Sequence, residues 1–191
     1  MNLQRRDLLK LAITSALAIS VPVRGGQDSA AAFAAALADL EKKSGGRLGV
    51  AVTDLDSGEL AGHRVDERFG MCSTFKLPLA AIVLLQAQRG QLDLDARVSY
   101  SSEDMVAYAP VTGKNLERGY MTVAELAKAT QQTSDNVAAN LLLGLVGGPA
   151  GFTASLRSMG DEVTRLDRIE PEMNYVPPGE VRDTTTPAAM A

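Results

Sequence analysis

The hydrophobic pattern predicts a chain that is largely helical. A long apolar run from Leu77 to Ala87 is typical of a buried helix, and Pro78 lies close enough to its start to be tolerated in the first turn. An amphipathic helix is expected earlier, at residues 28–46, because apolar residues recur there at helical spacing before a Gly-Gly stop. Cap and stop residues predict three more helices: from Thr122 to about Gln131, from Asn136 to Val146, and from Pro149 to Gly160.

Alternation of apolar and polar residues predicts one β-hairpin after the first helix. Arg47 to Thr53 alternates as a strand does, residues 55–58 have turn chemistry, and Glu59 to Val65 supplies the returning strand. His63 lies on that second strand, where we expect a surface position without a catalytic role. Because two strands do not make a stable sheet, further strands should complete it.

Residues 1–24 predict an export signal that is not part of the fold. Arg5 and Arg6 precede an apolar run, Leu11 to Val23, which is too short and too rich in Ala and Ser for a comfortable membrane span. This arrangement looks like a twin-arginine signal, and Arg24 just after the apolar run suits that route. We expect a periplasmic protein with no membrane segment after signal removal; a cytosolic protein with a short amphipathic start is the alternative.

Composition narrows the possible partners. The 191 residues carry a formal net charge of −4, and no basic run remains after the signal, so we expect no nucleic-acid partner. The one histidine offers no metal-ligand cluster, and no metal or cofactor is expected. Cys72 is the only cysteine, which excludes an internal disulfide. We expect either a free, buried thiol or a partner cysteine outside this sequence.

Candidate chemistry begins at the start of the buried helix, at Ser73-Thr74-Phe75-Lys76. If the helix begins at or just before Ser73, then Ser73 and Lys76 lie on one face. Serine needs a neighbouring base to act as a nucleophile, and the unpaired N–H groups of a helix start favour the oxyanion that its attack forms. The spacing predicts an acyl-transfer site, with a serine helix start and a snorkelling lysine as the structural alternative.

A second motif, Ser134-Asp135-Asn136, lies in the polar break between two predicted helices. The Ser134 hydroxyl could relay a proton to a departing nitrogen, and the Asn136 amide could hold a substrate carbonyl beside Lys76. The structural alternative is a helix cap, for which Ser, Asp and Asn are the preferred residues.

A third motif lies in a segment without helical or strand periodicity. Glu170 and Asn174, four residues apart, can hold one water between them, and the carboxylate can take its proton for attack on an ester. A cis bond between Glu170 and Pro171 is compatible with the sequence. Such a long loop needs a latch, which Arg168 and Asp183 could form as an ion pair; the alternative is a solvated acidic loop.

In this order and at these separations, the three motifs resemble those of class A serine β-lactamases. The resemblance implies an α/β (α+β) fold, in which an antiparallel sheet with flanking helices lies beside an all-helical subdomain and the site lies between them. It implies a small-molecule β-lactam as substrate, hydrolysis through an acyl-enzyme, no cofactor, and a monomer. The roles implied are Ser73 as nucleophile, Lys76 as its partner in activation, Ser134 as proton shuttle, Glu170 as base for the deacylating water with Asn174 helping to hold it, and Asn136 and Tyr108 as substrate contacts.

The family's third catalytic element, Lys-Thr-Gly or Lys-Ser-Gly on a sheet strand, is not found in this sequence, nor are the strands that should complete the sheet. We therefore interpret residues 25–191 as an incomplete catalytic domain: helix and hairpin 28–66, helical subdomain 73–167, omega-type loop 168–183, and the start of a further helix at 184–191. The absent strand would supply an oxyanion-hole N–H, and loss of one such donor typically costs on the order of 100 to 1,000-fold in rate. We expect poor turnover from the chain as given.

Two other functions remain open at this point. A D-Ala-D-Ala peptidase or penicillin sensor acylates on the same Ser-x-x-Lys helix but deacylates slowly, and the pair Glu170 and Asn174 argues against such a trap. The other alternative is a truncated product that is misfolded or non-catalytic. A cooperative unfolding transition would count against it, because it would show that the chain folds. A cysteine beside the nucleophile, as at Cys72, occurs in family members that pair it with a later cysteine, some of which hydrolyse carbapenems, and also in members where it stays free, so the sequence leaves the substrate spectrum open.

Overall fold

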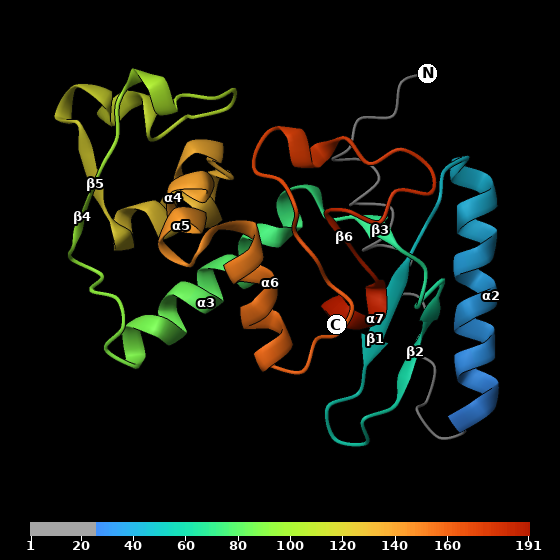
Figure 1. Cartoon of the computed structure of the whole chain (residues 1–191). Coiled ribbons are helices and arrows are strands. Elements are labelled where there is room, and N and C mark those ends of the chain that lie inside the picture. Colours follow the sequence, from blue (N-terminus) through green and yellow to red (C-terminus); the bar gives the residue numbers. More distant parts are fainter. Residues whose placement is uncertain (1–25) are drawn as a thin grey trace. The chain divides into compact units, whose positions relative to one another are not determined.

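A computed structural model describes residues 26–191, and the predicted export signal lies outside the described residues. The chain forms two compact units, which meet in sequence between His63 and Arg64 (Figure 1).

The described part of the first unit is a helix and a hairpin. Helix α2 (Gly26–Ser44) packs on strand β2 (Leu60–His63), which pairs antiparallel with β1 (Val50–Thr53). These elements match the predicted helix and hairpin, with shorter strands. The letters Lys-Ser-Gly do occur in this unit, at residues 43–45, but they form the end of α2 and the turn after it rather than a strand.

His63 is less exposed than the sequence predicts. Its ring Nε2 lies 3.1 Å from Glu41 Oε2 on α2, and only 18% of its side chain is exposed. The prediction of a surface position was wrong because alternation identifies the face of a strand but not the helix that covers it.

The second unit is mostly helical, as predicted. A 3-10 turn (Cys72–Phe75) leads directly into α3 (Lys76–Gln88). The helices that follow are α4 (Val123–Thr133), α5 (Asn136–Leu145), α6 (Gly148–Ser158) and α7 (Pro187–Met190), with further 3-10 turns at Ser102–Asp104, Gly113–Arg118 and Glu172–Asn174.

Side-chain caps set several of these boundaries. Thr122 and Glu125 form the predicted capping box at the start of α4, because each side chain binds the backbone N–H of the other. Ser101 and Asp104 form a second box. Thr186 caps α7 by accepting from the Ala189 N–H at 3.2 Å.

One hydrophobic core joins α3, α4, α5 and α6. Phe75 and Phe152 meet edge to face there, with ring centroids 6.2 Å apart. The other large side chains with almost no exposure include Met71, Leu79, Val83, Met121, Leu126, Leu142, Leu143 and Met173. Because interiors are packed as densely as organic crystals, this core holds the first turn of α3 rigidly.

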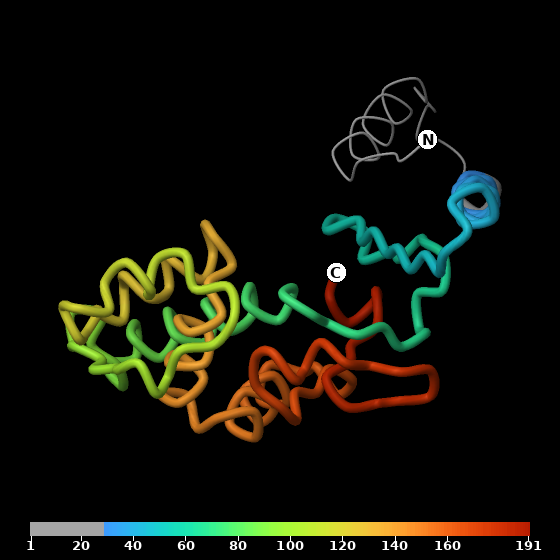
Figure 2. The backbone as a smooth tube through the Cα atoms, turned by 90° about the horizontal axis from the view of Figure 1, so that it is seen from above, coloured from blue at the N-terminus to red at the C-terminus, as the bar shows by residue number. Residues whose placement is uncertain are grey.

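The sequence missed two short strand pairs in this unit. Strand β4 (Arg97–Ser99) pairs with β5 (Tyr120–Thr122), and β3 (Phe69–Gly70) pairs with β6 (Thr184–Thr185). Strands of two or three residues are too short for alternation to be visible. The β3 and β6 pair matters for the site, because it joins the chain just before the 3-10 turn to the end of the loop at residues 168–183 (Figures 1 and 2).

Among residues 26–191, no single helix is long and apolar enough to cross a membrane; α5 and α6 pass that test only together, as a pair bent by 70°.

Candidate active site

The candidate nucleophile lies in the 3-10 turn that opens α3. Ser73 is exposed, whereas Lys76 is only 2% exposed. The Lys76 Nζ donates to Ser73 Oγ at 3.2 Å, so the three-residue spacing places the amine directly beside an accessible hydroxyl.

Lys76 is the centre of the site. Gln131 of α4 fixes its backbone by donating to the Lys76 carbonyl at 2.6 Å. Besides Ser73 Oγ, four oxygens surround Nζ: Ser134 O at 2.9 Å, Ser134 Oγ at 3.1 Å, Asn136 Oδ1 at 2.6 Å and Glu170 Oε1 at 3.0 Å. An amine has at most three protons, so these oxygens must share them. Lys76 therefore links two hydroxyls and one carboxylate from three separate segments.

Ser134 reaches Lys76 because of its backbone. It follows α4 with φ of 58°, a left-handed conformation that ends the helix. Asp135 is the N-cap of α5 and accepts from the Ala138 N–H at 2.9 Å. The helix-cap alternative therefore describes Asp135, whereas the Ser134 hydroxyl faces Lys76.

Asp135 also fastens the loop that precedes α4. Its fully buried carboxylate accepts from the backbone N–H groups of Val111 and Thr112, both at 2.9 Å, and from the Thr112 hydroxyl. This role of Asp135 was not predicted from the sequence; a buried carboxylate needs several hydrogen-bond donors, and here they come from residues distant in sequence.

Asn136, the first residue of α5, connects Lys76 to the segment that carries Tyr108. Its amide nitrogen donates to the Ala107 carbonyl at 2.9 Å, and its backbone N–H donates to the Tyr108 carbonyl at 3.0 Å. Tyr108 has φ of 63°, and 65% of the residue is exposed. The structure thus places Tyr108 next to the site through backbone contacts and leaves its side chain accessible.

Glu170 is almost completely buried, with 1% exposure. Its Oε2 accepts from the Asn174 amide, and the peptide bond to Pro171 is cis. Its Oε1 forms an ion pair with Lys76 but has no partner in hydrogen-bond geometry among the described residues. We attribute this to the lysine protons, which the four other oxygens also attract. Oε1 therefore keeps lone-pair capacity for a further donor.

Asn140 of α5, which was not predicted as a site residue, holds the backbone of Glu170. Its Oδ1 accepts from the Glu170 N–H at 3.0 Å, and its Nδ2 donates to the Glu170 carbonyl at 2.9 Å. The available signal was an asparagine inside an apolar helix, where it weakens the helix unless its amide has a tertiary partner.

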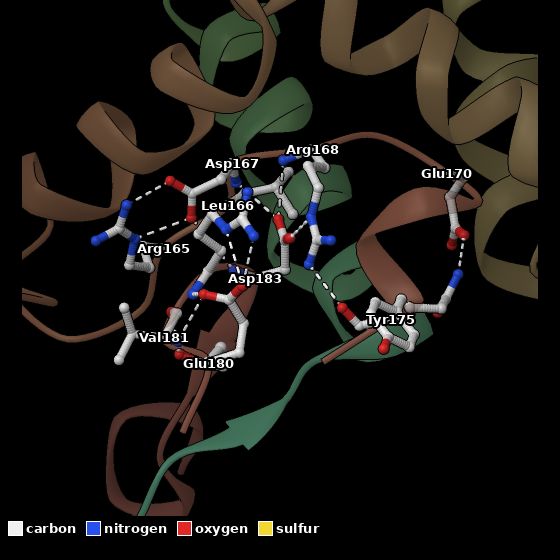
Figure 3. A network of polar contacts seen from close by, with 12 residues as sticks. Arg165, Leu166, Asp167, Arg168, Glu170, Tyr175, Glu180, Val181 and Asp183 are labelled. Carbon is white, nitrogen blue, oxygen red and sulfur yellow. Dashed lines mark hydrogen bonds and ion pairs between the residues drawn. The ribbon is translucent and has the colours of Figure 1, made fainter. Parts of the chain in front are cut away.

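Arg168 and Asp183 close the neck of the loop as an ion pair (Figure 3). The fully buried Asp183 accepts from Arg168 Nε at 2.5 Å through one oxygen, and from the N–H groups of Asp167 and Arg168 through the other. Arg168 also donates to the Tyr175 carbonyl at 2.9 Å. The guanidinium of Arg168 therefore binds both the neck of the loop, at Asp183, and its outer part, at Tyr175.

Two further ion pairs flank this neck. Arg165 binds Asp167, and its guanidinium holds the pKa of that carboxyl below the ordinary range. Arg182 binds Glu180 at 2.6 Å and lowers the pKa of Glu180 to about 2. In the view of Figure 3, Asp167 and Glu180 lie to the left of Asp183, and Glu170 lies to the right.

Cys72 is free and exposed, with φ of 44°. The expectation of a buried thiol was wrong, because the turn that places Ser73 directs Cys72 away from the core that receives Met71 and Phe75. Among residues 26–191, no group of three or more His, Cys, Asp or Glu side chains is placed to hold a metal ion.

Comparison with known proteins gives one consistent result. A model of the β-lactamase enzyme family matches residues 32–191. Beta-lactamase L2 from Stenotrophomonas maltophilia is 50% identical over 99% of this chain and 66% of its own length. Beta-lactamase FAR-1 from Nocardia farcinica is 55% identical over 82% of this chain and 50% of its own.

The solved structures agree. A class A β-lactamase of the last common ancestor of Gram-negative bacteria has a TM-score of 0.81 and 61% identity over 84% of this chain and 61% of that chain. The present chain spans about half to two thirds of the length of the curated relatives it matches.

We predict that Asn140→Ala loosens the loop around Glu170. Loss of both amide contacts leaves the Glu170 N–H and carbonyl without these partners, so hydrogen exchange at residues 169–174 should speed up by about tenfold. Asn115→Ala is the matched control, because that amide binds the Val111 carbonyl in another loop. Equal exchange at residues 169–174 in Asn140→Ala and wild type would contradict this role.

We also predict that Glu180 stabilises the protein only above acidic pH. Because its folded-state pKa of about 2 lies below its ordinary value of 4.5, its contribution is complete above about pH 4.5 and is lost as pH falls toward 2. Urea unfolding at several pH values should show Glu180→Gln less stable than wild type at pH 6, with the difference shrinking below pH 4.5. Glu172→Gln, on the same loop, is the control. A difference that grows on acidification is the contrary result.

Proposed function

Because this chain belongs to the class A β-lactamase family, we propose that its site hydrolyses β-lactam antibiotics through an acyl-enzyme on Ser73. The mixed fold of helices and small antiparallel sheets is that of the family. The observation that carries the proposal is the position of Lys76 Nζ, which lies within 3.2 Å of the Ser73 and Ser134 hydroxyls and of the Glu170 carboxylate.

In the acylation step, Ser73 Oγ attacks the β-lactam carbonyl carbon. Its proton passes to Lys76 Nζ, 3.2 Å away, as Lys76 passes one of its own protons to Glu170 Oε1, 3.0 Å away, so the pair as a whole takes up one proton. The ring C–N bond then breaks, and the Ser134 hydroxyl delivers its proton to the departing nitrogen. Lys76 donates a proton to Ser134 Oγ in its place. The chain of contacts from Ser73 through Lys76 to Ser134 supplies this route without a change of backbone.

In the deacylation step, Glu170 takes a proton from water, which attacks the ester carbon. Ser73 Oγ leaves and takes up the proton that Glu170 removed from the water, passed on through Lys76, which releases the opened product and restores the site. Oε1 has the lone-pair capacity to accept from that water, and Asn174 orients the carboxylate through Oε2. General-base assistance of this kind is worth roughly 100 to 10,000-fold in rate.

The pair formed by Glu170 and Asn174 favours β-lactam hydrolysis over the function of a peptidase or penicillin sensor that deacylates slowly. Burial of the carboxylate of Glu170 costs free energy unless a charged partner and hydrogen bonds compensate. Its placement between Lys76 and Asn174, with the backbone held by Asn140, is suited to a base that must act repeatedly.

We predict opposite effects of Ser73→Ala and Glu170→Ala in intact-mass analysis after brief exposure to a chromogenic cephalosporin. Hydrolysis of many equivalents by wild type would support the mechanism and overturn the expectation of poor turnover, and Ser73→Ala should form no adduct because it lacks the nucleophile. Glu170→Ala should accumulate the acyl-enzyme, with deacylation slower by roughly 100 to 10,000-fold.

The test also covers the expectation of poor turnover. If the chain alone gives neither adduct nor hydrolysis, addition of a C-terminal segment from a relative should restore both in wild type and not in Ser73→Ala. If wild type forms no adduct either alone or with the added segment, the proposal is wrong.

We further propose that the protein acts as a monomer in the periplasm, after export by the twin-arginine route. Support comes from the adjacent Arg5 and Arg6 before a short apolar run. Replacement of both arginines by lysine should retain the protein in the cytoplasm, as measured by cell fractionation. Unchanged periplasmic protein in this variant would argue for another route.

A further inference from the structure

Gly70, the last residue of β3, provides space that the side chain of Val176 occupies. A Cβ built at position 70 would lie 3.1 Å from Val176 Cγ2 and 3.2 Å from Val176 Cβ. Carbon atoms prefer a separation of about 3.5–4.0 Å, so even one methyl group would force a neighbour to move. The backbone of Gly70 is not in the left-handed region. A larger residue at position 70 would therefore be opposed by the lack of space and not by the backbone conformation.

The contact joins two segments that both belong to the site. Gly70 lies three residues before Ser73, and Val176 lies two residues after Asn174. The Met71 N–H donates to the Asp183 carbonyl at 3.0 Å, so the same strand end also binds the neck of the loop.

The inner and outer parts of the loop are held very differently. Asn140 clamps the backbone of Glu170, and Met173 is fully buried in the core. Asn174 and Tyr175 are exposed, and Tyr175 is held through its carbonyl by Arg168. A displacement of Val176 would therefore be taken up by the outer part, starting at Asn174, while Glu170 stays in place.

We propose that the contact between Gly70 and Val176 positions Asn174 against Glu170 and thereby controls deacylation. This inference rests on the proposed function. Gly70 and Val176 are positioning residues, since they act through Asn174 and touch neither substrate nor reacting atoms. A side chain at position 70 moves Asn174 away from Glu170 Oε2 but leaves the contact between Ser73 and Lys76 intact, because Phe75 anchors that turn in the core. Acylation is retained, and deacylation slows.

The experiment is a double-mutant cycle of Gly70→Ala and Val176→Gly, followed by intact mass and by separate acylation and deacylation rates with a cephalosporin. In the wild-type background, Gly70→Ala should slow deacylation by about tenfold and change acylation by less than about twofold. In the Val176→Gly background, Gly70→Ala should have almost no effect, because the atoms it would strike are gone. Gly46→Ala, where an added Cβ meets nothing within 4 Å, is the matched control.

Hydrogen exchange separates this inference from the proposed function. If wild type forms no adduct under any condition, the proposed function fails. The contact between Gly70 and Val176 is then tested by the hydrogen-exchange rates of two backbone amides: that of Asn174, which donates to the Pro171 carbonyl, and that of Tyr175, which donates to the Glu172 carbonyl. Gly70→Ala should speed their exchange while that of Glu170 stays constant.

Three results would overturn the inference: equal deacylation in Gly70→Ala and wild type, the same loss in both backgrounds of the cycle, or unchanged exchange at Asn174 and Tyr175. If Gly70→Ala does not fold, recovery of folding in the double variant supports the contact, and failure of the double variant to fold contradicts it.

Discussion

The buried ion pair between Lys76 and Glu170 is the interaction on which the rest of the site depends. Removal of two charges from water is costly, and their attraction compensates only when further polar contacts surround them. Here the hydroxyls of Ser73 and Ser134 and the amide of Asn136 surround the amine, while Asn174 binds the carboxylate. Loss of one partner of such a pair typically costs about 3–5 kcal/mol, because the other charge remains buried. The groups that would perform the chemistry are therefore also those that make the pair stable.

Each partner of this pair is fixed by a different kind of structure. Lys76 belongs to a helix whose first turns are held in the core by Phe75 and Leu79. Glu170 belongs to a loop with little regular structure, whose backbone polar groups need other partners. Asn140 and Asp183 supply them, the first at Glu170 and the second at the neck. A rigid nucleophile thus faces a base on a loop that is rigid only where side chains tie it down.

This division has a consequence for how the site could change in related proteins. The inner part of the loop is bound by directed hydrogen bonds, which tolerate little substitution. Apart from the hydrogen bond within the loop from the Tyr175 N–H to the Glu172 carbonyl, the outer part at Tyr175 and Val176 is bound by the Arg168 guanidinium and by one close packing contact, and the packing contact depends on side-chain volume. Volume at Gly70 can therefore adjust the loop without disturbing the ion pair.

The sequence by itself predicted most of the helices and the residues of the site, because both depend on local features. Caps such as Thr122 with Glu125, the apolar run after Lys76, and three motifs at fixed spacing can all be recognised within a few residues. Only the tertiary structure decided which residues of different motifs contact one another. Local spacing could not show that Lys76, Ser134 and Glu170 meet at one atom, that Asn140 holds Glu170, or that Val176 needs a glycine at position 70. The same limit explains His63 and the short strands β3 to β6, because their environment comes from residues distant in sequence, whose approach no local pattern records.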